Sequence, residues 1–218
     1  MLNIIFIGAP GCGKGTQAAV IAGKFSLQMI STGDILRLEI KNQSEIGKLA
    51  KQYIDQGQLV PNDVIINIIK NRISQDDCKN GVILDGFPRN LDQAIALDEM
   101  MQNLNFDINK VLHIEVFDDA LIKRISGRYS CNECGEVYNK FFKPTTKESI
   151  CDKCGSSDFL YRSDDNEKVV TQRLQVYHQQ TKPIIDFYSK KGLIFSVNGL
   201  KDIPLVTSDL VEILSEAA

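Results

Sequence analysis

The sequence predicts an α/β fold in which a parallel five-stranded sheet is flanked by helices. Short apolar runs have the length and composition of strands buried on both faces, and they lie at residues 2–7, 27–31, 82–84, 111–116 and 193–197. Helix-compatible stretches lie between these runs. Because the two kinds of segment alternate, we expect parallel strands, with any ligand at their carboxyl ends.

The first apolar run leads into a glycine-rich loop, residues 8–16, whose sequence GAPGCGKGT contains the spacing Gly-x4-Gly-Lys. A strand, such a loop and a following helix, here residues 17–25, aim several backbone N–H groups at one point, where an oligophosphate fits. Lys14 adds a mobile positive charge for the terminal phosphates. An ordinary tight turn is the alternative, but strand, spacing and helix all favour a phosphate-binding loop. Gly15 stands where Ser or Thr is usual, so the spacing does not assign Thr16 to magnesium.

Two further helices and two insertions complete the predicted organisation. Apolar residues recur at helical spacing over 64–73 and over 169–177, ahead of Pro183. Residues 31–60, which are polar and helix-like, and residues 127–164 break the alternation of strands and helices. We therefore expect a core of residues 1–30, 61–126 and 165–218, a helical insertion at 31–60 and a small separate unit at 127–164.

The composition is that of an ordinary globular chain. Of the 218 residues, 43% are apolar and 24% are charged, and the net charge of −3 argues against a polyanion-binding surface spread over the whole protein. No apolar stretch approaches the roughly 18 to 20 residues that span a bilayer, and the N-terminus begins on a core strand without the basic region of a signal peptide. We expect a cytoplasmic protein without a membrane partner, and nothing calls for more than a monomer.

Four of the six cysteines form two Cys-x2-Cys pairs separated by sixteen residues: Cys131 and Cys134, then Cys151 and Cys154. This spacing is typical of a zinc site, and a glycine after each pair relieves the tight backbone. Disulfides are the alternative, but a cytosolic chain would keep these thiols reduced. Four thiolates close the coordination shell, so the ion is expected to be structural. Cys78 has no partner motif, and Cys12 lies in the phosphate loop, where a helix N-terminus can favour a thiolate.

Arginine is sparse, with seven residues against eighteen lysines, and most arginines lie beside a motif. Arginine binds phosphate through two parallel hydrogen bonds, so this placement indicates phosphate chemistry although any one could be a surface residue. Arg124 and Arg128, four apart, are predicted to share one helical face at the entry to the cysteine segment. Asp85 ends the apolar run 82–84, from where a carboxylate can hold magnesium or its waters, unless it only caps the strand.

The chain resembles the adenylate kinases, in the long form whose lid binds zinc, over essentially its whole length. The resemblance is carried by the loop at 8–16, Ser31-Thr32-Gly33-Asp34 with Arg37, Asp85 to Arg89 with Gln93, Arg124 and Arg128, the four cysteines, and Arg162-Ser163-Asp164-Asp165 with Arg173. Arg72 alone among the arginines matches no position of the family. The resemblance implies a P-loop NTPase-like core, an AMP-binding insertion and a zinc-binding lid.

The resemblance also implies an activity, reversible phosphoryl transfer from MgATP to AMP giving two ADP, which serves adenine nucleotide homeostasis. The residues implied for ATP are Gly11, Cys12, Gly13, Lys14, Gly15, Thr16, Arg124, Arg128, Val137, Tyr138 and main chain near Lys201. Those implied for AMP are Thr32, Arg37, Gln58, Leu59, Val60, Gly86, Phe87, Pro88, Arg89, Gln93, Arg162 and Arg173. The catalytic set is Lys14, Asp85, Arg89, Arg124, Arg128, Arg162 and Arg173, with Mg²⁺ bound with ATP and structural Zn²⁺ bound by the cysteines.

Two alternatives remain at this stage. A kinase for UMP, CMP or GMP is the nearer one, although Thr32 and Gln93 favour adenine, with which a side-chain amide pairs through one donor and one acceptor. A nucleic-acid-binding zinc ribbon is the other. Between Cys131 and Cys154, four lysines are balanced by four acidic residues, so the ribbon offers no basic stripe for a nucleic acid.

Overall fold

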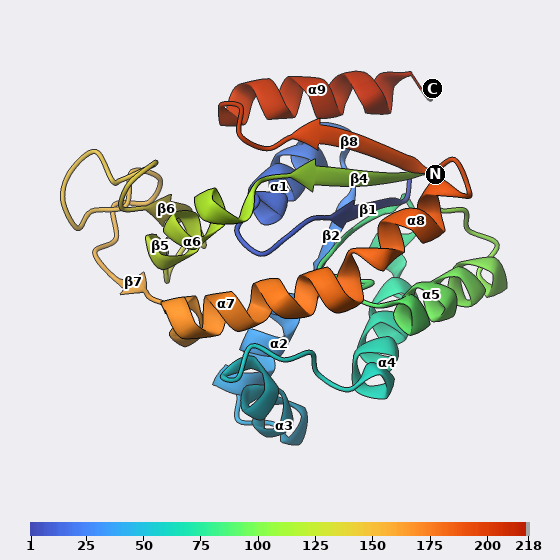
Figure 1. Ribbon diagram of the computed structural model, residues 1–218, viewed down its shortest axis with the longest axis horizontal. Coiled ribbons are helices and arrows are strands. Elements are labelled where there is room, and N and C mark those ends of the chain that lie inside the picture. Colours follow the sequence, from blue (N-terminus) through green and yellow to red (C-terminus); the bar gives the residue numbers. More distant parts are fainter. Residues whose placement is uncertain (217–218) are drawn as a thin grey trace.

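A computed structural model describes residues 1–216, whose core is a five-stranded parallel sheet (Figure 1). The strands are β1 (Ile4–Ile7), β2 (Gln28–Ser31), β3 (Val82–Asp85), β4 (Lys110–Glu115) and β8 (Ile194–Asn198). Their order is β2-β3-β1-β4-β8, and every neighbouring pair is parallel. All five predicted apolar runs are strands of this sheet, so the predicted fold class is confirmed.

Helices cover both faces of the sheet because successive side chains of each strand point to opposite sides. In β1, Ile5 and Ile7 belong to one apolar core, whereas Ile4 and Phe6 belong to the other. The first core is covered by α4 (Asn62–Ile73), α5 (Leu91–Asn103) and α8 (Pro183–Ser189). The second is covered by α1 (Lys14–Phe25), α6 (Asp118–Ser126), α7 (Glu167–Val176) and α9 (Ile203–Ser215). The continuous apolar sequence of the strands is thus explained by burial on both sides.

The helix predicted ahead of Pro183 is interrupted rather than ended. Helix α7 passes into a π-helical turn, Tyr177–Thr181, in which Lys182 N–H donates to the Tyr177 carbonyl at 2.8 Å. Pro183, which has no N–H to donate, then takes the first position of α8. The chain therefore continues as a helix from Glu167 past Pro183 to Ser189.

Residues 31–60 are helical, as their pattern predicts, and form α2 (Thr32–Lys41) and α3 (Glu45–Ile54). Each helix begins at a serine whose hydroxyl accepts a backbone N–H: Ser31 from Asp34 at 3.3 Å, and Ser44 from Gly47 at 3.0 Å. Gly47 lies against the end of α2, since a Cβ atom placed there would be 2.1 Å from the Glu39 carbonyl oxygen. In Figure 1 the pair lies below the sheet, beside α7.

The cysteine segment forms a small antiparallel sheet of β5 (Arg128–Cys131), β6 (Val137–Asn139) and β7 (Phe159–Leu160), in the order β6-β5-β7. It projects from the side of the molecule (Figure 1). It has a core of its own, formed by aromatic rings and cysteines. Short 3₁₀ turns lie at Asp76–Cys78 and Ser163–Asp165. The prediction that Arg124 and Arg128 share one helical face is wrong, because α6 ends at Ser126 and Arg128 opens strand β5.

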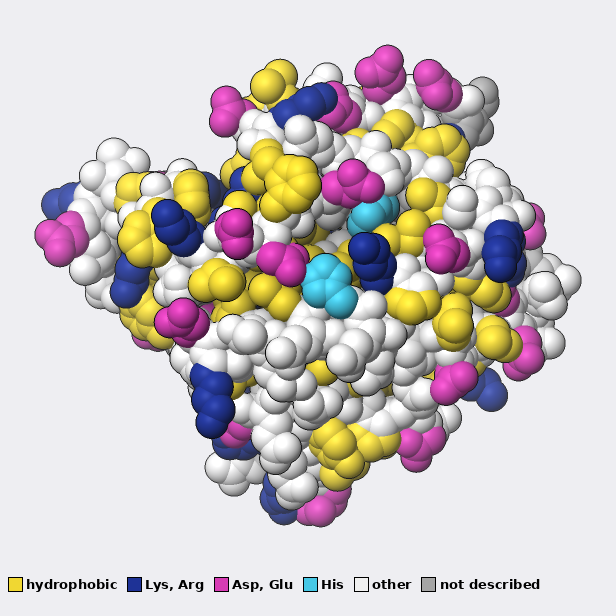
Figure 2. Space-filling model, viewed as in Figure 1, with side chains coloured by type: hydrophobic (Ala, Val, Ile, Leu, Met, Phe, Trp, Pro, Cys, Tyr) yellow, Lys and Arg dark blue, Asp and Glu magenta, His cyan; other side chains and the backbone are white. Residues whose placement is uncertain are grey.

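The surface carries both signs of charge. Figure 2 shows lysine and arginine side chains interspersed with aspartate and glutamate over the face drawn, the cysteine segment included. Among residues 1–216, no helix combines the length and hydropathy that a bilayer crossing requires.

Candidate active site

A cleft opens at the carboxyl ends of β1, β2 and β3, where the sequence predicts the ligand. Many of the predicted site residues line it: Lys14, Thr32, Arg37, Gln58, Leu59, Val60, Gly86, Pro88, Arg89, Gln93 and Arg173. They come from the start of α1, α2, the segment after α3, the loop after β3, the first turn of α5, and α7. The structure therefore gathers groups that lie up to 159 positions apart in the chain, from Lys14 to Arg173.

The glycine loop leads from β1 into α1 with the backbone that the motif predicts. Gly13 caps α1 with a φ of 101°, and Gly11 has a φ of 78°, both in the region that disfavours side chains. Lys14 Nζ donates to the carbonyls of Gly8 at 2.6 Å and Ala9 at 3.0 Å, which holds the ammonium over the loop. The free N–H groups at the start of α1 and this ammonium form an anion site.

Asp85 lies opposite the start of α1. A Cβ atom placed on Gly15 would be 3.4 Å from Asp85 Oδ2, so the glycine brings the loop close to this carboxylate. Burial raises the pKa of Asp85, while the positive charges of Lys14 and Arg89 act to lower it. A carboxylate beside a phosphate loop is the hard oxygen donor that Mg²⁺ prefers, so the site fits magnesium carried with ATP.

The loop after β3 is held tightly around Arg89. Arg89 Nε donates to the Gly86 carbonyl at 2.8 Å, and the same carbonyl accepts the Thr32 hydroxyl at 2.8 Å. The Thr181 hydroxyl, presented by the π-helical turn, donates to the Arg89 carbonyl at 2.7 Å. Burial, together with repulsion from Arg173, lowers the pKa of Arg89 to about 10. Phe87 is fully buried in the core beneath the loop, so its side chain supports the cleft and does not line it.

Beyond this loop, more arginines converge between the cysteine segment and α7. Arg128 forms a two-point contact with Asp165, at 2.8 Å from Nε and 2.5 Å from Nη2. Arg173 Nη1 donates to Asp164 at 2.8 Å and Asp165 at 3.2 Å. The two acids, to which the sequence assigns no role, thus neutralise two of the predicted phosphate ligands.

Among the described residues Arg162 makes no ion pair, although the negative charges of Asp165 and Asp164 act to raise its pKa. Burial, with repulsion from Arg128 and Arg37, lowers its pKa to about 10. Its Nε is buried and, within residues 1–216, has no hydrogen-bond partner. A buried guanidinium N–H without a partner is costly, and an anion bound beside Arg162 would satisfy it.

The residues expected around the ATP base lie outside the cleft described above. Arg124 Nη1 donates to the Gly199 carbonyl at 2.9 Å, which brings α6 to the loop that carries Lys201. Lys201 pairs with Asp209 at 2.6 Å, and Val137 is half-buried in β6. Tyr138 is only 1% exposed and stacks on Tyr129 inside the cysteine segment. Its ring is therefore enclosed within the cysteine segment.

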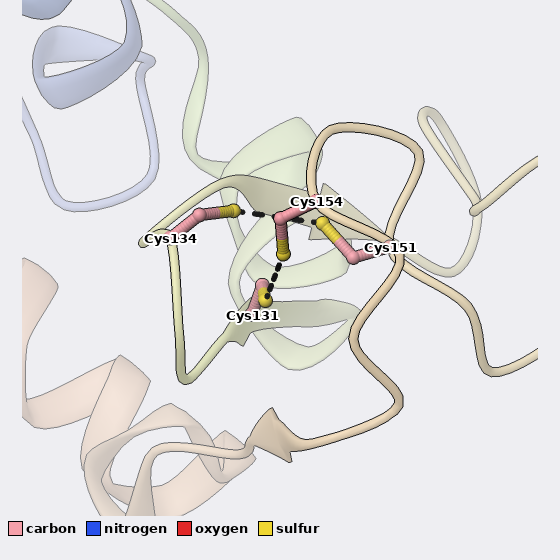
Figure 3. A group of neighbouring side chains, drawn as sticks. All are labelled: Cys131, Cys134, Cys151 and Cys154. Atoms are coloured by element: carbon pink, nitrogen blue, oxygen red, sulfur yellow. Dashed lines mark hydrogen bonds between the residues drawn. The ribbon is translucent and has the colours of Figure 1, made fainter.

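The four cysteines converge, as their spacing predicts (Figure 3). Their sulfur atoms all lie within 4.8 Å of one another, with 3.5 Å between Cys131 and Cys154 and 3.6 Å between Cys134 and Cys151. Tetrahedral zinc with bonds of about 2.3 Å requires sulfurs about 3.8 Å apart, so the cluster fits this ion. Gly135 and Gly155 have φ values of 72° and 76°, which confirms their predicted role in the two turns.

Tyr138 supports this cluster from behind. Asp152 N–H donates to the Tyr138 hydroxyl oxygen at 2.8 Å, which leaves the hydroxyl hydrogen for Cys151 Sγ at 3.3 Å. The remaining cysteines are separate from the cluster. Cys12 is 2% exposed beneath the glycine loop, and Cys78 is fully buried beside Arg72, which pairs with Asp77.

A phosphate loop ending a parallel strand, a carboxylate opposite it and a group of buried arginines define a phosphotransferase of the P-loop class. Comparison with known proteins narrows the class. The adenylate kinase family model matches residues 6–193. The adenylate kinase of Caldicellulosiruptor bescii is 47% identical over 98% of this chain and 99% of its own length, and that of Methanosarcina barkeri is 47% identical over 100% of both. The adenylate kinase of Archaeoglobus fulgidus is 46% identical over 99% of both.

The chain belongs to the adenylate kinase family, and it is an ATP:AMP phosphotransferase that uses Mg²⁺ with ATP. The resemblance stated from the sequence is confirmed, and kinases for UMP, CMP or GMP are not favoured. Two residues of the site are not predicted from the sequence. Thr181 lies in a π-helical turn without a sequence signature, and Asn62 contacts Gln93 at 2.9 Å across two helices. Asp164 and Asp165 could have been found, because two acids next to a predicted phosphate ligand need cationic partners once they are buried.

Proposed function

We propose that the cleft holds ATP and AMP with their phosphates facing each other, and that its residues divide between the two nucleotides. The glycine loop and Lys14 bind the β- and γ-phosphates of ATP, and Asp85 holds the magnesium ion through its carboxylate or its waters. Arg37 and Arg89 bind the phosphate of AMP, while Thr32, Gln93 and the segment 58–60 surround its base. Arg124, Val137 and main chain near Lys201 lie toward the base of ATP, and the Tyr138 side chain is left out of this set.

The reaction needs no general base. An oxygen of the AMP phosphate, already anionic, forms a bond to the γ-phosphorus, the bond from that phosphorus to the bridging oxygen of ATP breaks, and ADP leaves while AMP becomes ADP. Catalysis then comes from alignment of the two nucleotides and from cations around the moving group. Arg128, Arg162 and Arg173 are the cations assigned to it.

The contacts of these arginines support an exchange of partners. Asp164 and Asp165 neutralise Arg173 and Arg128 in the structure. Nucleotide phosphates compete with these carboxylates for the same guanidinium groups. On nucleotide binding, Arg128 and Arg173 would therefore exchange their carboxylate partners for the reacting phosphates. Closure of residues 127–164 over ATP would bring Arg128 with it and exclude water, the competing acceptor.

The division into domains follows from these roles. We assign residues 1–30, 61–126 and 165–216 to the core, 31–60 to AMP binding and 127–164 to the lid; the predicted core runs to 218, and residues 217–218 lie outside the described part of the chain. In the lid, Zn²⁺ replaces the large core that so small a segment lacks. The protein acts as a monomer in the cytoplasm, without nucleic-acid or membrane partners. The monomer is supported by the assembly of the whole cleft from one chain.

The gathering of cationic side chains at one cleft is the observation that carries the proposal. Lys14, Arg37, Arg89 and Arg173 line the cleft. Burial, with repulsion from neighbouring arginines, lowers the pKa of Arg89 and that of Arg162. Carboxylates pair with Arg37, Arg128 and Arg173, but within residues 1–216 Arg89 and Arg162 make no ion pair. A buried cation without a counter-ion is unfavourable unless an anion joins it. The polyphosphate formed by ATP and AMP end to end is such an anion.

The test is an acceptor assay. ATP is mixed separately with AMP, UMP, CMP and GMP, and diphosphate formation is followed with and without EDTA. We expect diphosphates from AMP alone and only with magnesium present. Equal rates with UMP or CMP, or ATP hydrolysis without an acceptor, would contradict the assignment.

A further inference from the structure

Three side-chain amides form a connected network at the AMP side of the cleft. Asn62 Oδ1 accepts hydrogen bonds from Asn90 Nδ2 at 2.8 Å and from Gln93 Nε2 at 2.9 Å. Gln93 Oε1 in turn accepts the backbone N–H of Arg89 at 2.8 Å. Asn62 begins α4 and Gln93 lies in the first turns of α5, so the network joins two helices at the residue assigned to the AMP base.

Groups that can only donate or only accept fix the orientation of each amide. The Arg89 backbone N–H only donates, so Gln93 must turn its oxygen toward it. Asn62 Nδ2 donates to the Asp92 carboxylate at 3.3 Å, which turns Asn62 Oδ1 toward Gln93. Asn90 Oδ1 accepts the Gln93 backbone N–H at 2.9 Å, which leaves its Nδ2 for Asn62. Rotating any one amide by half a turn would set donor against donor or acceptor against acceptor.

Gln93 keeps one donor and one acceptor for a ligand. Its amide carries two hydrogens and two oxygen lone pairs, of which Asn62 takes one hydrogen and Arg89 one lone pair. Within the part of the chain that the structure describes, no other group bonds this amide. Gln93 is 1% exposed and lines the cleft, so the free hydrogen and lone pair are available only to a molecule bound there.

We propose that Asn62 determines which purine the AMP site accepts, by holding the Gln93 amide in one orientation. The inference rests on the proposed function, which places the AMP base at Gln93. Adenine carries an amino donor at position 6 beside a ring-nitrogen acceptor, whereas a 6-oxopurine carries an acceptor at position 6. Against a fixed amide, adenine pairs at both points and hypoxanthine sets acceptor against acceptor.

Reversal of the amide is the route by which hypoxanthine could be accepted, and Asn62 opposes it. A reversed Gln93 would set its oxygen against Asn62 Oδ1 and its NH₂ against the Arg89 N–H. Loss of Asn62 removes the first of these penalties and keeps the second. Asn62 is therefore a positioning residue, and its loss should weaken the choice between the purines without abolishing it.

The experiment compares AMP with IMP as acceptors at saturating ATP. Asn62→Leu removes the accepting oxygen and keeps the branched heavy-atom skeleton of the side chain. Asn62→Asp, made together with Asp92→Asn so that two carboxylates do not face each other, keeps an oxygen that accepts from Gln93. We expect the kcat/KM ratio of AMP to IMP to fall about tenfold in Asn62→Leu, the scale of one hydrogen bond. KM for ATP should stay unchanged in both variants, and the double variant should keep the ratio of the original protein.

The outcomes separate this inference from the proposed function. If the kcat/KM ratio of AMP to IMP in Asn62→Leu equals that of the original protein, the role of Asn62 is overturned. The role is also overturned if the ratio falls by the same factor in the double variant as in Asn62→Leu. If the unmodified protein already accepts IMP as well as AMP, the assignment of the base to Gln93 fails instead, and the role of Asn62 with it. Should Asn62→Leu not fold, Asn62→Ala gives the same comparison, with a fall in the ratio supporting the role and an unchanged ratio contradicting it.

Discussion

Replacing Lys14 by Met tests the phosphate loop most severely, because it removes one charge and leaves the backbone cradle in place. Removal of one preorganised charge-stabilising donor costs roughly 3 to 4 kcal/mol of transition-state stabilisation, which is a fall of about 10² to 10³ in kcat. The loss to folding should be smaller. Lys14 Nζ makes two hydrogen bonds to loop carbonyls, at 2.6 Å and 3.0 Å, each worth about 1 kcal/mol. A fall in Tm of no more than about 8 °C is expected for a chain of this size.

The same substitution has a second consequence at Asp85. Burial raises the pKa of this carboxyl group, and Lys14 is the first of the positive charges that oppose the rise. Without Lys14 the pKa rises further, so the carboxylate is lost at a higher pH as the solution is acidified. If ionised Asp85 is needed for magnesium, the acid limb of the pH profile of residual kcat/KM moves to higher pH.

The assay measures ADP formation from ATP and AMP between pH 5 and 9, with thermal unfolding of the same samples. Lys24→Met is the matched control, since Lys24 is an exposed lysine in the last turn of the same helix. It should leave kcat and the pH profile unchanged. A Lys14→Met protein with near-normal kcat, or a loss of rate explained by unfolding, would refute the reasoning.

Three further predictions concern the lid and the AMP-binding segment. Removing zinc with a chelator should lower the unfolding temperature of residues 127–164. A fall in the rate of ADP formation at low temperature, while circular dichroism shows the lid intact, would contradict a structural role for the ion. Tyr138→Phe should speed zinc loss to a chelator about tenfold, since it removes the hydrogen bond to Cys151. The control is Tyr129→Phe, because the Tyr129 hydroxyl accepts the Thr145 N–H and contacts no zinc ligand. Equal rates of zinc loss in the two variants would contradict the role of Tyr138. Gly47→Ala should raise KM for AMP severalfold and leave KM for ATP unchanged, because its Cβ would lie 2.1 Å from the Glu39 carbonyl oxygen. Gly23→Ala, with no atom within 4 Å of the added carbon, should change neither KM, and a normal KM for AMP in Gly47→Ala would contradict the close packing of α2 and α3.

The core of the fold could be predicted because its strands are buried on both faces. Residues such as Ile4 and Ile5 of β1 must both be apolar, since one faces each core, and a continuous apolar run is visible in a single sequence. The lid strands are different. β6 and β7 have three and two residues, and the lid core consists of aromatic rings and cysteines, so neither periodicity nor apolar runs indicate the small sheet.

The site was predictable where spacing along the chain fixes geometry in space. The two Cys-x2-Cys turns and the glycine loop are local, so their sequences contain the information that their structures use. The error at Arg128 arose because a spacing of four indicates a shared face only while the helix continues, and α6 ends between the two arginines. Contacts such as Thr181 with Arg89 and Asn62 with Gln93 join distant segments, and no pattern in one sequence reveals them.

The central claim is that one cleft holds two nucleotides with their phosphates facing each other. Titration calorimetry with a bisubstrate mimic, two adenosines joined by a polyphosphate chain, tests it most directly. We predict that one molecule of the mimic binds per chain, far more tightly than ATP or AMP alone. A chain saturated with the mimic should bind neither ATP nor AMP. Binding no tighter than that of ATP, or AMP still binding to the saturated complex, would contradict the account.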